Sequence, residues 1–241
     1  MIKILAVLSC LAAFSAHAQI PGDIDPKTKR IQEQVEQLFE EGEQLAAQGE
    51  LQRAHFNFKR AHSIYKNDLA PLGDKYAQYM VGFMYLTGTG VDEDPVTASA
   101  WYRLAAESSF PELLAVRDQV LDSLTDVERM RSDQIFVQLR SKYSDVVLLL
   151  DMIEDDIEDI TARTGSRISG GSGAVTIVDP RSGRSVSGDE YFRRLQDRID
   201  GHLERMGKFV DLDDFDVDYD HFNIDGLRAI VNDYVHTIND R

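Results

Sequence analysis

The sequence contains a single cysteine, Cys10, among its 241 residues. That cysteine lies in an N-terminal apolar stretch that has the features of a cleaved leader. Once the leader is removed, the chain has no disulfide, no thiol nucleophile and no thiolate metal site. An exported protein of this kind must be stabilised by packing, which is compatible with a bacterial periplasm.

Basic residues are scarce relative to acidic ones. Lys and Arg total 26 against 42 Asp and Glu, which gives a formal net charge of -16. A surface this acidic repels the phosphates of nucleic acids and the head groups of anionic lipids. We therefore predict no nucleic-acid partner, whereas a cationic partner or a divalent cation is compatible with the charge.

Long hydrophobic runs are absent beyond the N-terminal stretch. The longest strongly apolar run there is Val146–Leu150, which is far shorter than a membrane-spanning helix requires. We therefore predict no transmembrane segment.

The first residues are typical of a secretory signal peptide. Lys3 supplies a positive start, Ile4–Phe14 forms the apolar stretch, and Ala16 and Ala18 fit the small-x-small rule for cleavage after Ala18. Lipoprotein anchoring through Cys10 fits less well, because the apolar run before it is very short. We predict that residues 1–18 are a signal peptide and that the protein is periplasmic or secreted.

The segment from Lys27 to about Ala162 has apolar residues at three- and four-residue spacing, with prolines between the periodic stretches. This pattern predicts an all-α region. One part of it repeats: the spacing of Gly42, Leu45, Ala54, Phe58 and Ala61 resembles that of Gly82, Tyr85, Ala98, Tyr102 and Ala105. Small residues let paired helices approach closely, and the aromatic residue fills the space one turn away. The repeated spacing therefore predicts two stacked helix hairpins.

The turn within the second hairpin contains two glycines, Gly88 and Gly90, and raises the question of a phosphate-binding loop. It follows a helix rather than a strand, no Gly-Lys-Ser/Thr sequence follows it, and its three acids would repel a phosphate. We interpret it as a connection in which Gly88 caps one helix while Asp94 and Pro95 begin the next.

Residues Ala77–Ser109 resemble a Sel-one-like repeat, a relative of the tetratricopeptide repeat. The matching positions are Ala77, Gly82, Tyr85, Gly88, Gly90, Val91, Asp94, Ala98, Trp101, Tyr102, Ala105 and Ala106. Two positions depart: the family usually has Gly at Ser109 and a small residue near Leu113. The resemblance implies an adaptor that gathers other proteins. Its working surface would be the concave face made by the first helices of the hairpins.

Further helices are predicted over Pro111–Ser123 and from the capping-box pattern at Thr125–Glu128 to about Tyr143. A following apolar stripe comprises Val146, Leu149, Leu150, Ile153, Ile157 and Ile160, and the acids stand mostly off it. One interpretation is an end helix of the solenoid with a solvated acidic back. The other is a stripe that pairs with a partner helix, including helix-mediated self-association.

Composition changes at residue 163. Residues 163–188 are basic and rich in Gly and Ser, which indicates a linker. Within it, Ala174–Val178 and Arg184–Val186 are predicted to pair as a small hairpin. We expect this hairpin to dock on another part of the same chain. A helical tail follows, with a helix from Glu190 to Met206 that Ser187 or Asp189 caps, and another over about Gly226–Ile238. Their expected apolar stripes are Phe192, Leu195, Ile199, Leu203 and Met206, then Leu227, Ile230, Val231, Tyr234 and Ile238.

An acidic segment, residues 211–225, lies between the two tail helices. Oxygen-bearing side chains occupy positions 1, 3, 5, 7 and 12 of a calcium loop: these are Asp214, Asp216, Asp218, Asp220 and Asp225. However, Tyr219 stands where the loop needs a turn glycine, and His221 stands at an aliphatic position. An edge strand with one wet face, or a solvated loop, fits as well, so we expect no specific calcium site.

No catalytic constellation is visible. His55, His62, His202, His221 and His236 have no HExxH pattern or carboxylates at ligand spacing, so we assign them to packing or the surface. His55 and His62 are expected on one helix face. We predict no catalytic, cofactor-binding or metal-binding residue, and no enzymatic activity.

These patterns predict an all-α fold: a short α/α solenoid at 19–162, a linker at 163–188 and a helical tail at 189–241. The predicted function is an exported, non-enzymatic adaptor or scaffold of the bacterial cell envelope that binds a protein partner. The alternative is a divalent-cation-responsive module that acts through residues 214–225. An enzyme acting on envelope polymers has little support, since such chemistry needs a carboxylate or Ser/His constellation.

Overall fold

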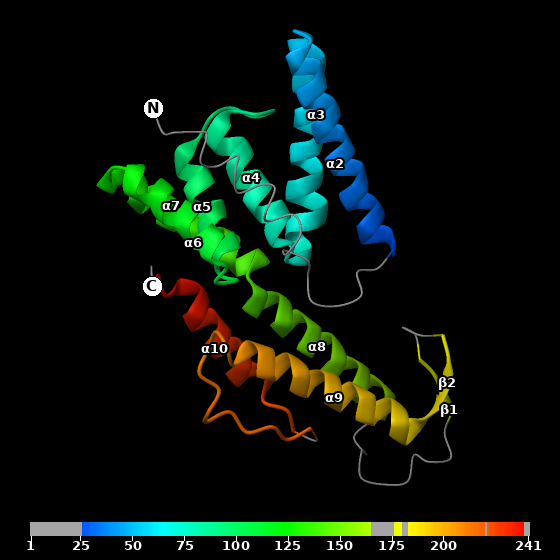
Figure 1. Cartoon of the computed structure of the whole chain (residues 1–241). Helices are drawn as coiled ribbons and strands as arrows, with labels where there is room; N and C mark the ends of the chain where they lie inside the picture. The colour runs from blue at the N-terminus through cyan, green and yellow to red at the C-terminus, as the bar shows by residue number, and fades with distance from the viewer. Residues whose placement is uncertain (1–25, 165–175, 180–182, 220, 239–241) are drawn as a thin grey trace. The chain divides into compact units, whose positions relative to one another are not determined.

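The computed structural model describes residues 26–164, 176–179, 183–219 and 221–238 (Figure 1). The predicted signal peptide, 1–18, lies outside these residues. The chain forms two compact units, divided between Ser144 and Asp145, and each is described by itself. The division falls earlier than the expected end of the repeat region at 162, because the helix that begins at Asp145 packs within the second unit.

The described residues of the first unit form helices joined by short turns and connections, as predicted. Its helices are α2 (Pro26–Ala47), α3 (Leu51–Ile64), α4 (Lys75–Thr87), α5 (Pro95–Ala106), α6 (Pro111–Ser123) and α7 (Asp126–Tyr143). A π-helical turn and a 3₁₀ turn, Tyr65–Leu69 and Ala70–Leu72, join α3 to α4. The pairs α2–α3 and α4–α5 are packed side by side, and α6 and α7 both pack on α5 (Figure 1). This is the arrangement of a short stacked-hairpin solenoid.

The helix ends follow the predicted capping chemistry. Gly88 ends α4 in the left-handed conformation, with φ of 68°. Asp94 Oδ1 accepts hydrogen bonds from the Val96 and Thr97 amides, and Pro95 is the first residue of α5. Thr125 and Glu128 form the predicted capping box. The Gly88–Pro95 segment is therefore a connection between two packed helices.

The repeated glycine–aromatic pairs hold both hairpins. A Cβ atom at Gly42 would lie 2.7 Å from a ring carbon of Phe58, and one at Gly82 would lie 3.1 Å from a ring carbon of Tyr102. In each hairpin the aromatic ring of the second helix thus occupies the space that a side chain on the first would need. The sequence comparison between the two hairpins is confirmed.

Trp101 lies at the centre of the first unit. It is 1% exposed, and its ring stacks on Tyr143 of α7 with centroids 5.9 Å apart. Beside it, Arg103 of α5 and Arg140 of α7 lie over the Phe136 ring, at 4.3 and 5.3 Å from its centroid. Both arginines are also paired across the two helices.

Those pairs join α5 to α7. Arg103 Nη1 donates to Asp133 Oδ1 at 2.6 Å, and Arg140 Nε donates to Glu107 Oε1 at 2.7 Å. Breaking such a buried pair is costly because one charge would be left without its partner. This network was not foreseen from the sequence.

The two departures from the repeat pattern have clear places in the structure. Ser109 adopts a φ of 59°, a conformation that L-residues rarely adopt and that explains the usual glycine there. Leu113 is buried and joins the core around α5. The repeat therefore retains its backbone path with a less favourable residue at 109.

The second unit contains α8 (Asp145–Thr164), β1 (Thr176–Val178), β2 (Ser185–Ser187), α9 (Gly188–Met206) and α10 (Ile224–His236). Helix α8 lies along α9, and α10 also packs on α8 (Figure 1). The apolar stripe of α8 is therefore covered by helices of its own chain. The helix therefore packs within the second unit rather than as an end helix of the solenoid, and the helix that pairs with its stripe is α9 of the same chain.

The two strands form an antiparallel hairpin, with Ile177 opposite Val186. They fall within or beside the predicted segments, of which residues 174 and 175 lie outside the described residues. Both strands contact α9, so the hairpin docks in the same chain as expected. Ser187 accepts a hydrogen bond from the Glu190 amide and caps α9.

The tail helices differ in detail from the expected stripes. Tyr191 is buried and Phe192 is only half-buried, whereas Leu195, Ile199, Leu203 and Met206 are buried as predicted. In α10, Val235 is buried, while Ile238 lies beyond the helix and is exposed. In α10, Leu227 and Val231 are buried as expected, whereas Ile230 and Tyr234 are only half-buried.

One acid of α8 is fully buried rather than solvated. Both oxygens of Asp156 accept hydrogen bonds from Arg198 of α9, at 2.8 and 3.0 Å. This fork-shaped contact joins the two helices with defined geometry. Arg228 of α10 also pairs with Glu154 at 2.7 Å.

We predict that Trp101→Ala lowers the free energy of unfolding by roughly 3–5 kcal/mol, because it leaves a cavity at the centre of the first unit. Thermal unfolding followed by far-ultraviolet circular dichroism measures the change without relying on tryptophan fluorescence. Phe56→Ala, at a 60% exposed position, is the control and should change stability by less than about 0.5 kcal/mol. Equal melting of the Trp101 variant and the parent would contradict this packing.

We predict that Arg198→Ala destabilises the second unit by about 3 kcal/mol, because Asp156 would lose its paired donor while buried. Amide hydrogen exchange should accelerate in α8 and α9 and stay unchanged in α4 and α5. Arg194→Ala is the matched control on the same helix, since it removes only an exposed pair with Glu190. Similar acceleration in both variants would refute a special role for the buried pair.

Candidate interaction surface

Helix α4 offers little surface to a partner. Lys75 and Ala77–Met84 are all buried, including the aromatic residues Tyr79 and Phe83. Neighbouring elements enclose it: Phe39 of α2 meets Phe83, Tyr102 of α5 meets Tyr79, and the turns before α4 cover its start. The expected concave face made by first helices therefore lacks α4 as a contributor.

Helix α3 exposes a continuous face instead. Its members share helical spacing and exposure: Gln52, His55, Phe56, Lys59, Arg60 and Ser63. We call this set the α3 face. Phe56 is 60% exposed, and the Arg60 guanidinium carbon lies 5.9 Å from its ring centroid. An exposed aromatic ring beside a cation is a common element of protein-binding surfaces.

The charge of the α3 face opposes that of the whole protein. Residues 51–67 contain no Asp or Glu, although the chain has 42 of them. Within the described residues, Lys59 and Arg60 form no ion pair. Arg53, to one side, pairs with Glu50. The face is therefore a basic strip with an aromatic centre on an acidic protein.

Two neighbours border the α3 face. Asn57 donates a 3.5 Å hydrogen bond to Glu41 of α2. The α4–α5 connection approaches on another side, where a Cβ atom at Gly90 would lie 2.6 Å from the Phe58 carbonyl carbon and 2.7 Å from the Lys59 nitrogen. Only glycine permits this contact, which fixes α3 against the second hairpin. The face is thus supported by packing rather than carried on a free helix.

His62 lies at the buried end of the same helix. Its ring meets Tyr85 edge-to-face at 5.1 Å, and its Nε2 atom is buried without a hydrogen-bond partner. Burial, together with the charge of Lys66, lowers the pKa of His62 to about 4. His55, seven residues earlier in the same helix, is exposed. The two histidines thus share a helix but have different environments.

The acidic segment forms a loop between α9 and α10 rather than an edge strand, since residues 211–219 make no strand pairing. The side chains of Asp214, Asp216 and Asp218 are exposed. Tyr219 does not take the left-handed conformation that a calcium loop needs at this position. Its hydroxyl instead donates to Asp200 of α9, so the loop is tied to that helix. Asp220 lies outside the described residues.

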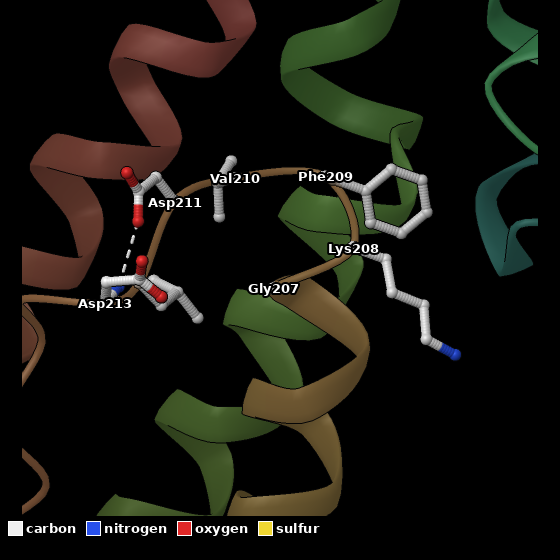
Figure 2. A pocket seen from close by; sticks show the side chains of 7 residues that line it. Gly207, Lys208, Phe209, Val210, Asp211 and Asp213 are labelled. Atoms are coloured by element: carbon white, nitrogen blue, oxygen red, sulfur yellow. Dashed lines mark hydrogen bonds between the residues drawn. The ribbon is translucent and has the colours of Figure 1, made fainter.

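The start of this loop surrounds an open hollow of about 450 Å³, lined by Gly207–Asp213 (Figure 2). Lys208 and Phe209 extend on one side, and Asp211 and Asp213 lie at the other end. Asp211 Oδ1 accepts the Asp213 amide at 3.0 Å, so one of its oxygens is used by the loop itself. The described residues contain no group of three His, Cys, Asp or Glu side chains that could hold a metal ion. No observation favours a calcium site.

The remaining histidines have ordinary surroundings. His221 and His236 are exposed, and His202 is half-buried. His236 Nδ1 lies 2.8 Å from the Asn232 carbonyl oxygen, one turn earlier in α10. His221 Nδ1 lies 3.4 Å from Asp218 Oδ2 at the exposed surface, but no third potential ligand joins this pair within the described residues.

The fold and the exposed face define a helical-repeat module of the kind that binds proteins. Residues 75–110 match the family model described as Sel1 repeat, which agrees with the resemblance seen at Ala77–Ser109. Sel1 repeats generally mediate protein binding, and the match identifies no catalytic family. No curated protein and no solved structure matches the chain. Across the described residues, no helix has the length and apolar character needed to cross a bilayer.

We predict that the stability of the first unit falls as pH decreases from about 6.5 to about 4. The lower figure is the folded pKa of His62 and the upper its ordinary value, so the unfolded chain binds the proton first and acid favours unfolding. His62→Leu should reduce this pH dependence in urea unfolding series. His55→Leu, at the exposed position, should leave it unchanged. An unaltered slope in the His62 variant would show that another group is responsible.

We predict that the acidic loop binds calcium only weakly, through the summed potential of exposed carboxylates, which salt screens. Calorimetric titration at physiological salt should show no saturable one-to-one binding near micromolar calcium, where sensor loops bind. A variant with Asp214→Asn and Asp218→Asn is the comparison. Saturable micromolar binding that this variant abolishes would establish a calcium-responsive module.

Proposed function

We propose that the protein is an exported, non-enzymatic adaptor or scaffold of the bacterial cell envelope that binds another protein through the α3 face. The observation that carries the proposal is the exposed, basic and aromatic α3 face on a module that contains a Sel1 repeat. Protein binding follows from the class of repeat. The choice of α3 rests on its exposure, since α4 is enclosed.

The proposed location rests on sequence. The positive start, the apolar stretch and the small residues before position 19 are the features of a cleaved leader. Absence of cysteine after that point is compatible with folding in a periplasm. Fractionation of cells that express the full chain, with mass analysis of its N-terminus, tests both the export and the cleavage after Ala18.

Site-specific photo-crosslinking in an envelope extract tests the binding role. A crosslinking amino acid at Ser63, on the α3 face, should form a discrete adduct with a partner. The same amino acid at Gln119, an exposed residue of α6, is the matched control and should form none. Absence of a discrete adduct at Ser63, or equal adducts at both sites, would refute the proposed surface.

A further inference from the structure

We propose that the α3 face takes an acidic segment of a partner protein, in which an apolar side chain lies between carboxylates. The inference rests on the proposed protein-binding function and specifies the chemistry of the partner. It is carried by three observations: the exposure of Phe56, the free charges of Lys59 and Arg60, and the absence of acids from residues 51–67.

The positive charges of Lys59 and Arg60 determine that a partner segment must be negatively charged. Lys59 and Arg60 are adjacent in sequence on the exposed side of α3, and no described carboxylate pairs with either. Arg can hold a carboxylate with two parallel hydrogen bonds, and Lys adds a point charge beside it. A basic partner would meet uncompensated like charge here, whereas acidic side chains would pair with both residues.

The aromatic ring supplies the remaining contact. Exposed ion pairs contribute little by themselves, so a stable complex also needs apolar area to leave water. Phe56 is the largest exposed apolar side chain on the α3 face. An apolar residue of the partner that packs on its ring would bring the flanking carboxylates to Arg60 and Lys59. Acidic and apolar residues in alternation therefore match the α3 face.

Other polyanions fit less well than a peptide. The net charge of -16 repels extended anionic surfaces such as nucleic acid or anionic lipid bilayers. A short segment meets only the local potential, which screening limits to about 8 Å at physiological ionic strength. Its carboxylates therefore respond to the α3 face more than to the distant acids of the protein.

The test is fluorescence anisotropy with a labelled peptide, Glu-Asp-Phe-Glu-Asp-Leu-Glu-Asp, and the mature chain. The peptide should bind saturably. A variant with Lys59→Glu and Arg60→Glu should bind at least about tenfold more weakly, which corresponds to about 1.4 kcal/mol. Phe56→Ser should also weaken binding, as should replacement of the peptide's Phe and Leu by Ser.

The matched control carries Arg131→Glu and Lys142→Glu, exposed residues of α7, and so has the same net charge as the α3 variant. Its affinity should stay within about twofold of the parent value. A charge-conserving variant, with Lys59→Arg and Arg60→Lys, should retain binding, which would show that positive charge at these two positions is what the peptide needs.

Several results would overturn the proposal: no binding of the peptide, equal loss in the α7 variant, or tighter binding of a peptide with Lys at the acidic positions. Self-association or binding to anionic lipid vesicles that the α3 variant abolishes would also overturn it, by identifying a different occupant. If the Ser63 adduct forms equally well in the α3 charge variant, the adaptor function stands and the acidic-partner inference fails. If no adduct forms at Ser63 in the parent protein, the α3 face is not the binding surface and the proposed function fails at that surface.

Discussion

Close approach of paired helices at a glycine is the constraint on which the first unit depends. Gly42 and Gly82 leave room for Phe58 and Tyr102, and this contact fixes the distance between the helices of each hairpin. Gly90 then brings the second connection onto the backbone of α3. The same packing encloses α4 and leaves the outer side of α3 exposed. The positions of these three glycines therefore determine which helix face stays exposed as the candidate surface.

Much of this architecture was predictable from local chemistry. The glycine–aromatic spacing identified both hairpins, and the caps at Gly88, Asp94 and Thr125 marked helix ends. These signals are local, so they survive in a single sequence. The π-helical turn over Tyr65–Leu69 and the two arginines on Phe136 were missed, because both depend on contacts between elements that are distant in sequence.

The candidate surface was harder to predict than the fold. The family resemblance predicts a binding face on the first helices of the hairpins, but the burial of Tyr79 and Phe83 depends on how the hairpins pack together. A usable signal was present in the sequence: residues 51–67 have no acid in a strongly acidic chain. The apolar stripe of α8 shows the opposite situation. Its helical period was predicted correctly, but spacing alone could not identify α9 of the same chain as the helix that covers it.

The central claim is that the α3 face is where a partner binds. Amide hydrogen exchange of the complex with the crosslinked partner, compared with the free protein, tests it most directly. The account predicts slower exchange over residues 51–67 and the adjoining Gly90 connection, with the loop at 207–219 unchanged. Protection confined to that loop, or spread over α7 without α3, would contradict the account.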